Sequence, residues 1–199
     1  MNTTDFRFPV QWVCRPQTQE YHDFRGFMGR IEAGEISAGD EITVLPSGRT
    51  TRIKEIVTYD GKLQTAYAPQ SVTLTLEDEI DISRGDMFVK GGAAPQAAKE
   101  FRAMLCWLSE APLEKSRKYL VKHTTRTAKC LFNGIDHRVD VNTLEHHPAD
   151  TLKMNDIAQV SLKVQQPLVF DSYATDRATG SFIVIDEATN NTVAAGMIA

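Results

Sequence analysis

Short runs of alternating apolar and polar residues constrain this chain more than any other feature. The clearest run is Val72–Leu76, in which three aliphatic residues alternate with two threonines. Side chains of a β-strand point to opposite faces in turn, so such a run predicts a strand with one buried face. The same period of two recurs at Phe6, Phe8, Val10 and Trp12, at Phe101, Ala103, Leu105 and Trp107, and at Val160, Leu162 and Val164.

Turn signals separate these runs at short intervals. Ser47-Gly48, Asp60-Gly61 and Asn133-Gly134 each lie between strand-like segments, and Asp-Gly and Asn-Gly favour the tight turns of antiparallel hairpins. Phe182–Ile185 is apolar at every position and is typical of a strand buried on both sides. The only helix-like window, Leu113–His123, has a thin apolar face and predicts a turn that leads into a strand at Tyr119–Val121. The pattern therefore predicts an all-β protein with closed or sandwiched antiparallel sheets.

One segment of small, uncharged residues, Gly91–Ala98, interrupts the pattern near the midpoint of the 199 residues. We interpret it as a linker between two β domains, residues 1–92 and 93–199. Each domain is long enough to hold a hydrophobic core of its own.

The composition excludes several functional classes. A hydrophobic content of 42% with 24% charged residues is ordinary for a soluble globular protein. A net charge of −4 argues against a nucleic-acid partner, which usually meets a basic face. We expect a solvated face from the one basic stretch, which contains Lys115, Arg117, Lys118, Lys122, Arg126 and Lys129.

Three cysteines without C-x-x-C spacing indicate reduced thiols, at positions 14, 106 and 130. The sequence has neither an N-terminal signal-like segment nor a run near the roughly 20 apolar residues of a membrane span. We therefore expect a cytoplasmic protein without a membrane partner.

No phosphate-binding loop of the form G-x-x-x-x-G-K-[ST] occurs in the sequence. Gly61-Lys62 is the only Gly-Lys pair, and Ile56 and Leu63 stand where the first glycine and the hydroxyl would be needed. Asp23–Gly26 matches the letters D-x-x-G of a GTPase switch, but we interpret the match as accidental without the loop before it. We predict no catalytic, cofactor-binding or metal-binding residue in this chain.

Two groups of residues carry side chains that could bind a metal ion. His137 with Asp136 and Asp140, and the acidic run Glu77–Asp81, carry oxygen and nitrogen ligands, but solvated loop positions explain both groups better. His146 and His147 are adjacent, so on a strand they point to opposite faces and cannot chelate one ion together.

Four charged residues form the most interesting group: Arg25, Arg30, Arg84 and Asp86. Arginine makes rigid contacts with several donors, which suit interfaces and phosphate oxygens. The pattern favours structural ion pairs, and an interface is the alternative.

Gly29–Asp40 and Ile82–Asp86 resemble the second-domain signature of elongation factor Tu and its relatives. Leu152–Ile157, Gln166–Asp171 and Thr192–Ile198 resemble the closing strands of the third domain. The resemblance covers nearly the whole chain. It implies two consecutive antiparallel β-barrels like domains 2 and 3 of that factor.

Four stretches resemble, more narrowly, the GTP-binding large subunit of bacterial sulfate adenylyltransferase: Asp23–Phe27, Val44–Gly48, Asp78–Asp86 and Asp140–Leu144. In that family a small subunit transfers the adenylyl group of ATP to sulfate, and the large subunit hydrolyses GTP to drive the transfer. The resemblance implies that GTP and Mg²⁺ belong to a G domain, which these residues do not include. The fragment itself would be inactive.

The implied partners are that G domain and the small catalytic subunit, with Arg25, Arg30 and Arg84 as interface contacts. Two alternatives stay open. The chain could be part of a translation-elongation-type GTPase that binds tRNA, or a free-standing barrel with a small-molecule site.

Overall fold

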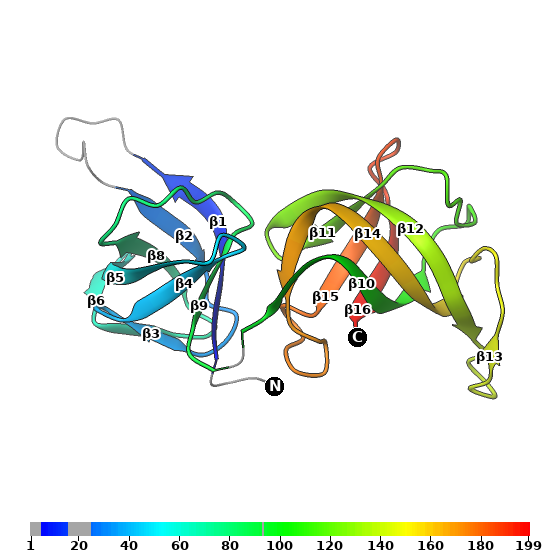
Figure 1. Cartoon of the computed structure of the whole chain (residues 1–199), viewed down its shortest axis with the longest axis horizontal. Helices are drawn as coiled ribbons and strands as arrows, with labels where there is room; N and C mark the ends of the chain where they lie inside the picture. Colours follow the sequence, from blue (N-terminus) through cyan, green and yellow to red (C-terminus); the bar gives the residue numbers. More distant parts are fainter. Residues whose placement is uncertain (1–4, 16–24, 93) are drawn as a thin grey trace. The chain divides into compact units, whose positions relative to one another are not determined.

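The structure, a computed structural model, describes residues 5–15, 25–92 and 94–199. Every regular element among these residues is a β-strand (Figure 1). The chain divides into two compact units, Met1–Pro95 and Gln96–Ala199. No helix in the described part of the chain is long and apolar enough to cross a membrane.

The first unit is a closed antiparallel barrel. Six strands form its ring in the order β4-β9-β1-β2-β8-β5, and β5 pairs back onto β4. The hairpin strand β6 extends β5, and β3 pairs with β7 in a small separate sheet. The strands are β1 (Phe6–Cys14), β2 (Gly26–Arg30), β3 (Glu35–Ser37), β4 (Glu41–Leu45), β5 (Arg49–Thr58), β6 (Gly61–Leu63), β7 (Thr65–Tyr67), β8 (Ser71–Leu76) and β9 (Met87–Lys90).

The second unit closes in the same way. Its ring runs β11-β15-β16-β10-β14-β12 and returns to β11, and β13 pairs with the far end of β12. The strands are β10 (Gln96–Trp107), β11 (Tyr119–His123), β12 (Arg126–Val139), β13 (His146–His147), β14 (Ile157–Phe170), β15 (Ser181–Asp186) and β16 (Thr192–Ile198). The predicted fold class, two antiparallel β-barrels, is confirmed.

Each barrel is filled by its own aromatic cluster. In the first barrel the Phe88 ring lies 5.6 Å from Phe8 and 5.5 Å from Phe27, centroid to centroid. In the second, Tyr119 makes edge contacts with Trp107 at 5.9 Å and with Phe132 at 5.5 Å. The two hydrophobic clusters share no residue, so each barrel has a core that does not depend on the other for its packing.

The same four-residue turn precedes a strand three times: Ser37–Asp40 before β4, Ser83–Asp86 before β9, and Lys153–Asp156 before β14. In each turn the final aspartate accepts a hydrogen bond from the backbone N–H of the first residue, at 2.8, 2.9 and 2.7 Å. The backbone N–H of the aspartate donates in return to the carbonyl of the first residue. The third residue has a positive φ, which explains Gly39, Gly85 and Asn155 at these positions.

Most of the predicted alternation is confirmed. The apolar members of the runs in β8, β10 and β14 point into the barrels; Val72, Leu74, Phe101, Ala103, Leu105, Trp107, Val160, Leu162 and Val164 are buried. β11 begins at Tyr119, as expected, after a loop and not after a helix. Ser47-Gly48 and Asp60-Gly61 lie at the hairpins β4–β5 and β5–β6.

β1 departs from the predicted pattern at both ends. A register shift between Val10 and Trp12 in its pairing with β2 marks a β-bulge, and beyond the bulge Trp12 is 61% exposed although Val10 is buried. Arg7, on the other parity, is buried, and its backbone exchanges hydrogen bonds with Ala33 and Glu32. Placing Trp12 on the inward face with Phe6, Phe8 and Val10 was therefore wrong.

Two turn and linker predictions also need correction. Asn133-Gly134 lies inside β12, where the register shifts between Phe132 and Gly134, so the pair forms a bulge and not a hairpin turn. Gln96–Ala98, predicted as linker, begins β10 and pairs with β14. Phe182–Ile185, predicted to be buried on both faces, is buried on one. Phe182 and Val184 are buried, and Ile183 and Ile185 are only partly buried.

Candidate interaction surfaces

The three predicted interface arginines all belong to the first barrel, but they do not form one cluster. Arg25 directly precedes β2 and Arg30 ends it, so about 16 Å of extended strand separates their backbones. Arg84 lies in the turn before β9. Asp23 and Phe24, which belonged to the same signature, lie outside the described residues.

Arg25 contacts one aromatic ring and one acid. Its guanidinium lies over the Phe27 ring, 5.3 Å from the centroid, and 3.9 Å from the Asp81 carboxylate. Burial lowers the pKa of Arg25, and the positive charge of Arg15 lowers it further. Nε of Arg25 is buried without a hydrogen-bond partner among the described residues.

Backbone carbonyl groups hold the other two arginines. Arg30 Nε donates to the Pro69 carbonyl at 3.3 Å, and its Nη1 is 3.9 Å from Glu32. Arg84 Nη1 donates to the carbonyl of Gln11 at 3.2 Å. These two hydrogen bonds hold the guanidinium groups in place.

The structure does not bring the candidate metal ligands together. The His137 ring stacks on His146 at 3.8 Å between centroids, Asp136 pairs with Arg102 at 3.5 Å, and Asp140 caps the turn that follows it. Within the described ranges no three His, Cys, Asp or Glu side chains are placed to hold a metal ion.

The acidic run Glu77–Asp81 lies along a loop that Ile80 anchors in the core. Two of its carboxylates contact other residues of the barrel. Asp78 accepts a hydrogen bond from Thr51 at 2.8 Å, and Asp81 faces Arg25.

The basic stretch of the second barrel is partly neutralised by acids on the β15–β16 turn. Arg117 Nη2 is 2.6 Å from Asp186, and Lys129 Nζ is 2.9 Å from Glu187. These pairs bind the stretch to the barrel.

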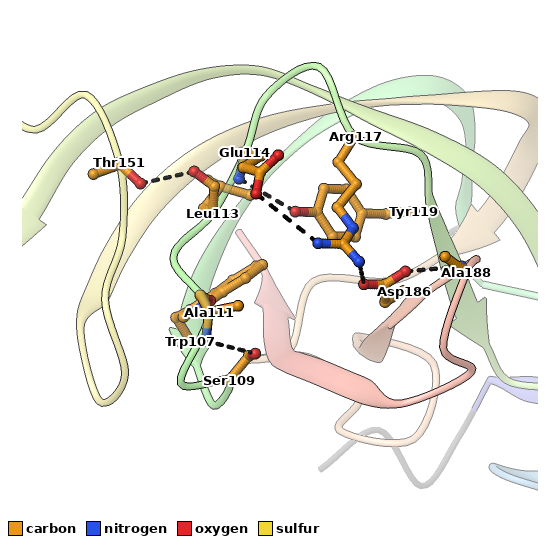
Figure 2. A network of polar contacts seen from close by, with 10 residues as sticks. All are labelled: Trp107, Ser109, Ala111, Leu113, Glu114, Arg117, Tyr119, Thr151, Asp186 and Ala188. Carbon is orange, nitrogen blue, oxygen red and sulfur yellow. Dashed lines mark hydrogen bonds and ion pairs between the residues drawn. The ribbon is translucent and has the colours of Figure 1, made fainter.

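A polar network holds the β10–β11 loop against one end of the second barrel (Figure 2). The Trp107 indole donates to the Ala111 carbonyl at 2.8 Å, and the Thr151 hydroxyl donates to the Leu113 carbonyl at 2.7 Å. Asp186, which is buried, accepts both from Arg117 and from the Ala188 N–H at 2.8 Å. Every one of these contacts is internal, so we interpret the network as structural.

The outer face of the second barrel carries an apolar groove of about 660 Å³. Cross-strand neighbours Ile183, Ala195, Cys106 and Ile157 form a row across it, with Met104 and Met197 beside them. Lys122 is the only charged residue among the described residues that line it. Three hydroxyl-bearing residues, Thr124, Tyr173 and Ser181, also line the groove.

The cysteines are free thiols, as predicted. Burial raises the pKa of Cys130 to about 12, so this thiol stays protonated and unreactive at neutral pH.

One exposed patch on the first barrel was not predicted from the residue pattern. Trp12 and Met28 are cross-strand neighbours on the outer face of β1 and β2, and Tyr59 is fully exposed at the β5–β6 hairpin. The signal for Tyr59 was its place beside Asp60-Gly61. The outward position of Trp12 depends on the bulge, which the alternation of apolar and polar residues does not reveal.

Comparison with known proteins places these barrels in context. The family model described as GTP-eEF1A C-terminal domain-like matches residues 100–199. Over 99% of its length the chain is 51% identical to "Sulfate adenylyltransferase subunit 1" from Saccharophagus degradans, and 50% identical to "Bifunctional enzyme CysN/CysC" from Rhodopirellula baltica. It spans 41% and 30% of these two relatives.

The fold similarity extends to a crystal structure of sup35 complexed with GDP. The TM-score is 0.86 at 18% sequence identity, and the match covers 99% of this chain and 47% of that one. At this identity the similarity shows a shared fold of two barrels and nothing about ligands.

Proposed function

Because this chain belongs to the GTP-eEF1A C-terminal domain-like family and is a homologue of sulfate adenylyltransferase subunit 1, we propose that it acts as the two-barrel part of such a subunit. In this proposal the complete enzyme forms adenosine 5′-phosphosulfate from ATP and sulfate. GTP hydrolysis in a separate G domain drives that reaction. The barrels themselves contribute contacts to the G domain and to the small catalytic subunit.

The observation that carries the proposal is the 51% identity over 197 residues, which extends through both barrels. The chemistry of the surfaces supports a role in contacts. The first barrel presents an exposed aromatic patch and the second an apolar groove. A rigid barrel is suited to transmit a nucleotide-dependent movement as a body.

Calorimetric titration of the chain with the small, ATP-binding subunit of a sulfate adenylyltransferase tests this proposal. We expect a dissociation constant in the micromolar range or tighter. If the titration releases no heat and the chain does not co-elute with the small subunit, a docking role for the barrels is excluded.

A second titration, with GTP and Mg²⁺, tests the division of labour. We expect no binding at micromolar nucleotide, because the sequence has no phosphate-binding loop. Micromolar affinity for GTP would contradict the assignment of that site to another domain.

A further inference from the structure

Three sulfur-bearing side chains lie together in the apolar groove of the second barrel. Met104 and Cys106 are two residues apart on β10, and Met197 lies on the neighbouring strand β16. The register places Met104 directly opposite Met197, and Cys106 opposite Ala195, the residue two positions before Met197. All three sulfur-bearing residues line the same groove. We call Met104, Cys106 and Met197 the sulfur cluster.

The alternation of the two strands turns the sulfur cluster outward. Leu105, between Met104 and Cys106, is buried in the core, and so is Ile198, the residue after Met197. Met104 and Cys106 are partly exposed, and Met197 is 42% exposed. An ion in solvent can therefore reach all three sulfur atoms.

Sheet geometry keeps the three sulfur atoms within reach of one point. Directly opposite residues of paired strands have Cβ atoms about 5 Å apart, and residues two apart on one strand are about 7 Å apart. A methionine side chain is unbranched and has three rotatable bonds, so its thioether can turn toward a neighbour. The two thioethers can thus face the Cys106 thiol from its own strand and from the next one.

The chemistry of these donors selects a soft cation. Thiolate and thioether sulfur favour Cu(I), whereas Ca²⁺ and Mg²⁺ require oxygen ligands and Zn²⁺ is held by thiolate, imidazole or carboxylate. Among the described residues that line the groove there is neither a carboxylate nor an imidazole. His, Cys, Asp and Glu side chains form no three-ligand site in the described part of the chain, so the two methionines supply the donors that complete this one.

We propose that the sulfur cluster binds one Cu(I) ion through the Cys106 thiolate and the thioethers of Met104 and Met197. This site is independent of the proposed function of the barrels. On binding, the Cys106 thiol releases its proton to solvent and a copper–sulfur bond takes its place. Copper stays monovalent and no electron is transferred. The charges of Cu⁺ and one thiolate cancel, so the apolar groove receives a neutral group, whose desolvation costs little.

The one charged side chain of the groove lies far from the sulfur cluster. Lys122 pairs with Ile183, Ile183 with Ala195, and Ala195 with Cys106. Three strand spacings, about 14 Å along the sheet, therefore separate Lys122 from Cys106. This exceeds the screening length of about 8 Å at physiological ionic strength, so the ammonium does not repel the ion appreciably.

The expectation that this chain holds no metal rested on oxygen and nitrogen ligands and on the lack of C-x-x-C spacing. The sulfur cluster has no such local pattern, because Met197 comes from a strand distant in sequence. Only the pairing of β10 with β16 brings the third sulfur to the other two.

Competition with bicinchoninate, a coloured Cu(I) chelator, tests the site on the whole chain without oxygen. We expect the chain to withdraw one Cu(I) ion from the chelator. Cys106→Ser should weaken the affinity about a hundredfold or more, because it removes the only anionic ligand. Met104→Leu and Met197→Leu keep the side-chain volume nearly unchanged, and each should weaken the affinity about tenfold.

Two matched variants serve as controls. Cys14→Ser removes the other partly exposed thiol, and Met154→Leu replaces a methionine that is 50% exposed outside the groove. Both should keep the affinity of the wild-type chain. Urea denaturation of every variant shows whether the second barrel stays folded, so that a lost site is not mistaken for a lost fold.

X-ray absorption at the copper edge identifies the ligands directly. We expect three sulfur neighbours in the wild-type chain and two in Met104→Leu. No withdrawal of copper, binding that survives Cys106→Ser, or binding that neither methionine variant weakens would each overturn the proposal. Equal affinity for Zn²⁺ in a matched competition would overturn the assignment to a soft cation. None of these outcomes bears on binding of the small subunit, which tests the proposed function separately.

Discussion

At the scale of single residues, burial decides the chemistry of the few titratable side chains inside the barrels. His123 is 1% exposed, and its Nε2 lies 2.7 Å from the Thr179 carbonyl. A carbonyl only accepts, so Nε2 carries a proton and donates it. The Thr179 hydroxyl in turn donates to Asp171 at 2.7 Å. Burial lowers the pKa of His123, and the nearby Thr179 carbonyl and Asp171 offset only part of that effect.

This burial predicts a loss of stability in mild acid. Above the unfolded-state pKa of 6.5, His123 is neutral in both states and contributes no pH dependence. As the pH falls below 6.5, the unfolded chain binds a proton that the folded chain resists, so the free energy of unfolding decreases until the folded pKa is passed. Urea midpoints of the second barrel at pH 7.5 and 5.5 measure the effect. His123→Gln, which keeps a donor but does not titrate, should lose less between the two pH values. Equal losses would assign the pH dependence to other groups.

At the scale of elements, close backbone approach explains a glycine of the signature segment. A Cβ on Gly29 would lie 2.5 Å from the Pro9 carbonyl oxygen and 2.9 Å from the Phe8 ring, beside the bulge that joins β1 to β2. The carbonyl belongs to the backbone of the neighbouring strand and cannot swing away. The glycine therefore permits the two strands to pair where β1 changes face.

Gly29→Ala should destabilise the first barrel by about 2 kcal/mol, because the strands must separate or the Phe8 ring must leave its place. Gly134→Ala is the matched control in β12, since a Cβ there meets nothing within 4 Å. Chemical denaturation of both variants measures the difference. A cost below that of the control would show that β1 relaxes freely at the bulge.

A second element, the β10–β11 loop, depends on one buried carboxylate. Asp186→Ala removes the acceptor of Arg117 and of the Ala188 N–H, which we expect to cost about 2 kcal/mol, as charged hydrogen bonds do at a partly exposed site. Amide exchange over residues 108–118 should accelerate. Glu114→Ala removes only the distant partner of Arg117, at 3.9 Å, and should change the stability by less than about 0.5 kcal/mol. Similar effects of the two variants would contradict the central role of Asp186.

At the scale of the whole molecule, two separate cores imply two separable units. Phe88→Ala should destabilise the first barrel by about 3–5 kcal/mol, because it removes a fully buried ring between Phe8 and Phe27. In a Trp12→Phe background, Trp107 fluorescence reports the second barrel alone, and its unfolding midpoint should not move. Phe132→Ala, inside the second cluster, is the control that should move it. A shift of the Trp107 transition in Phe88→Ala would mean that the barrels unfold as one cooperative unit.

The strands, most of the inward-facing residues and the resemblance to subunit 1 could be predicted from the sequence, because a period of two and a Gly-Asp turn are local properties. The tertiary structure decided the rest. Three features depend on residues distant in sequence. They are the pairing of β4 with β5 that closes the first ring, the bulge that turns Trp12 outward, and the bridge between Arg7 and Ala33. The arginines can be identified from the sequence alone. The exposure of Trp12 cannot, because it follows from a one-residue shift in the pairing of β1 with β2.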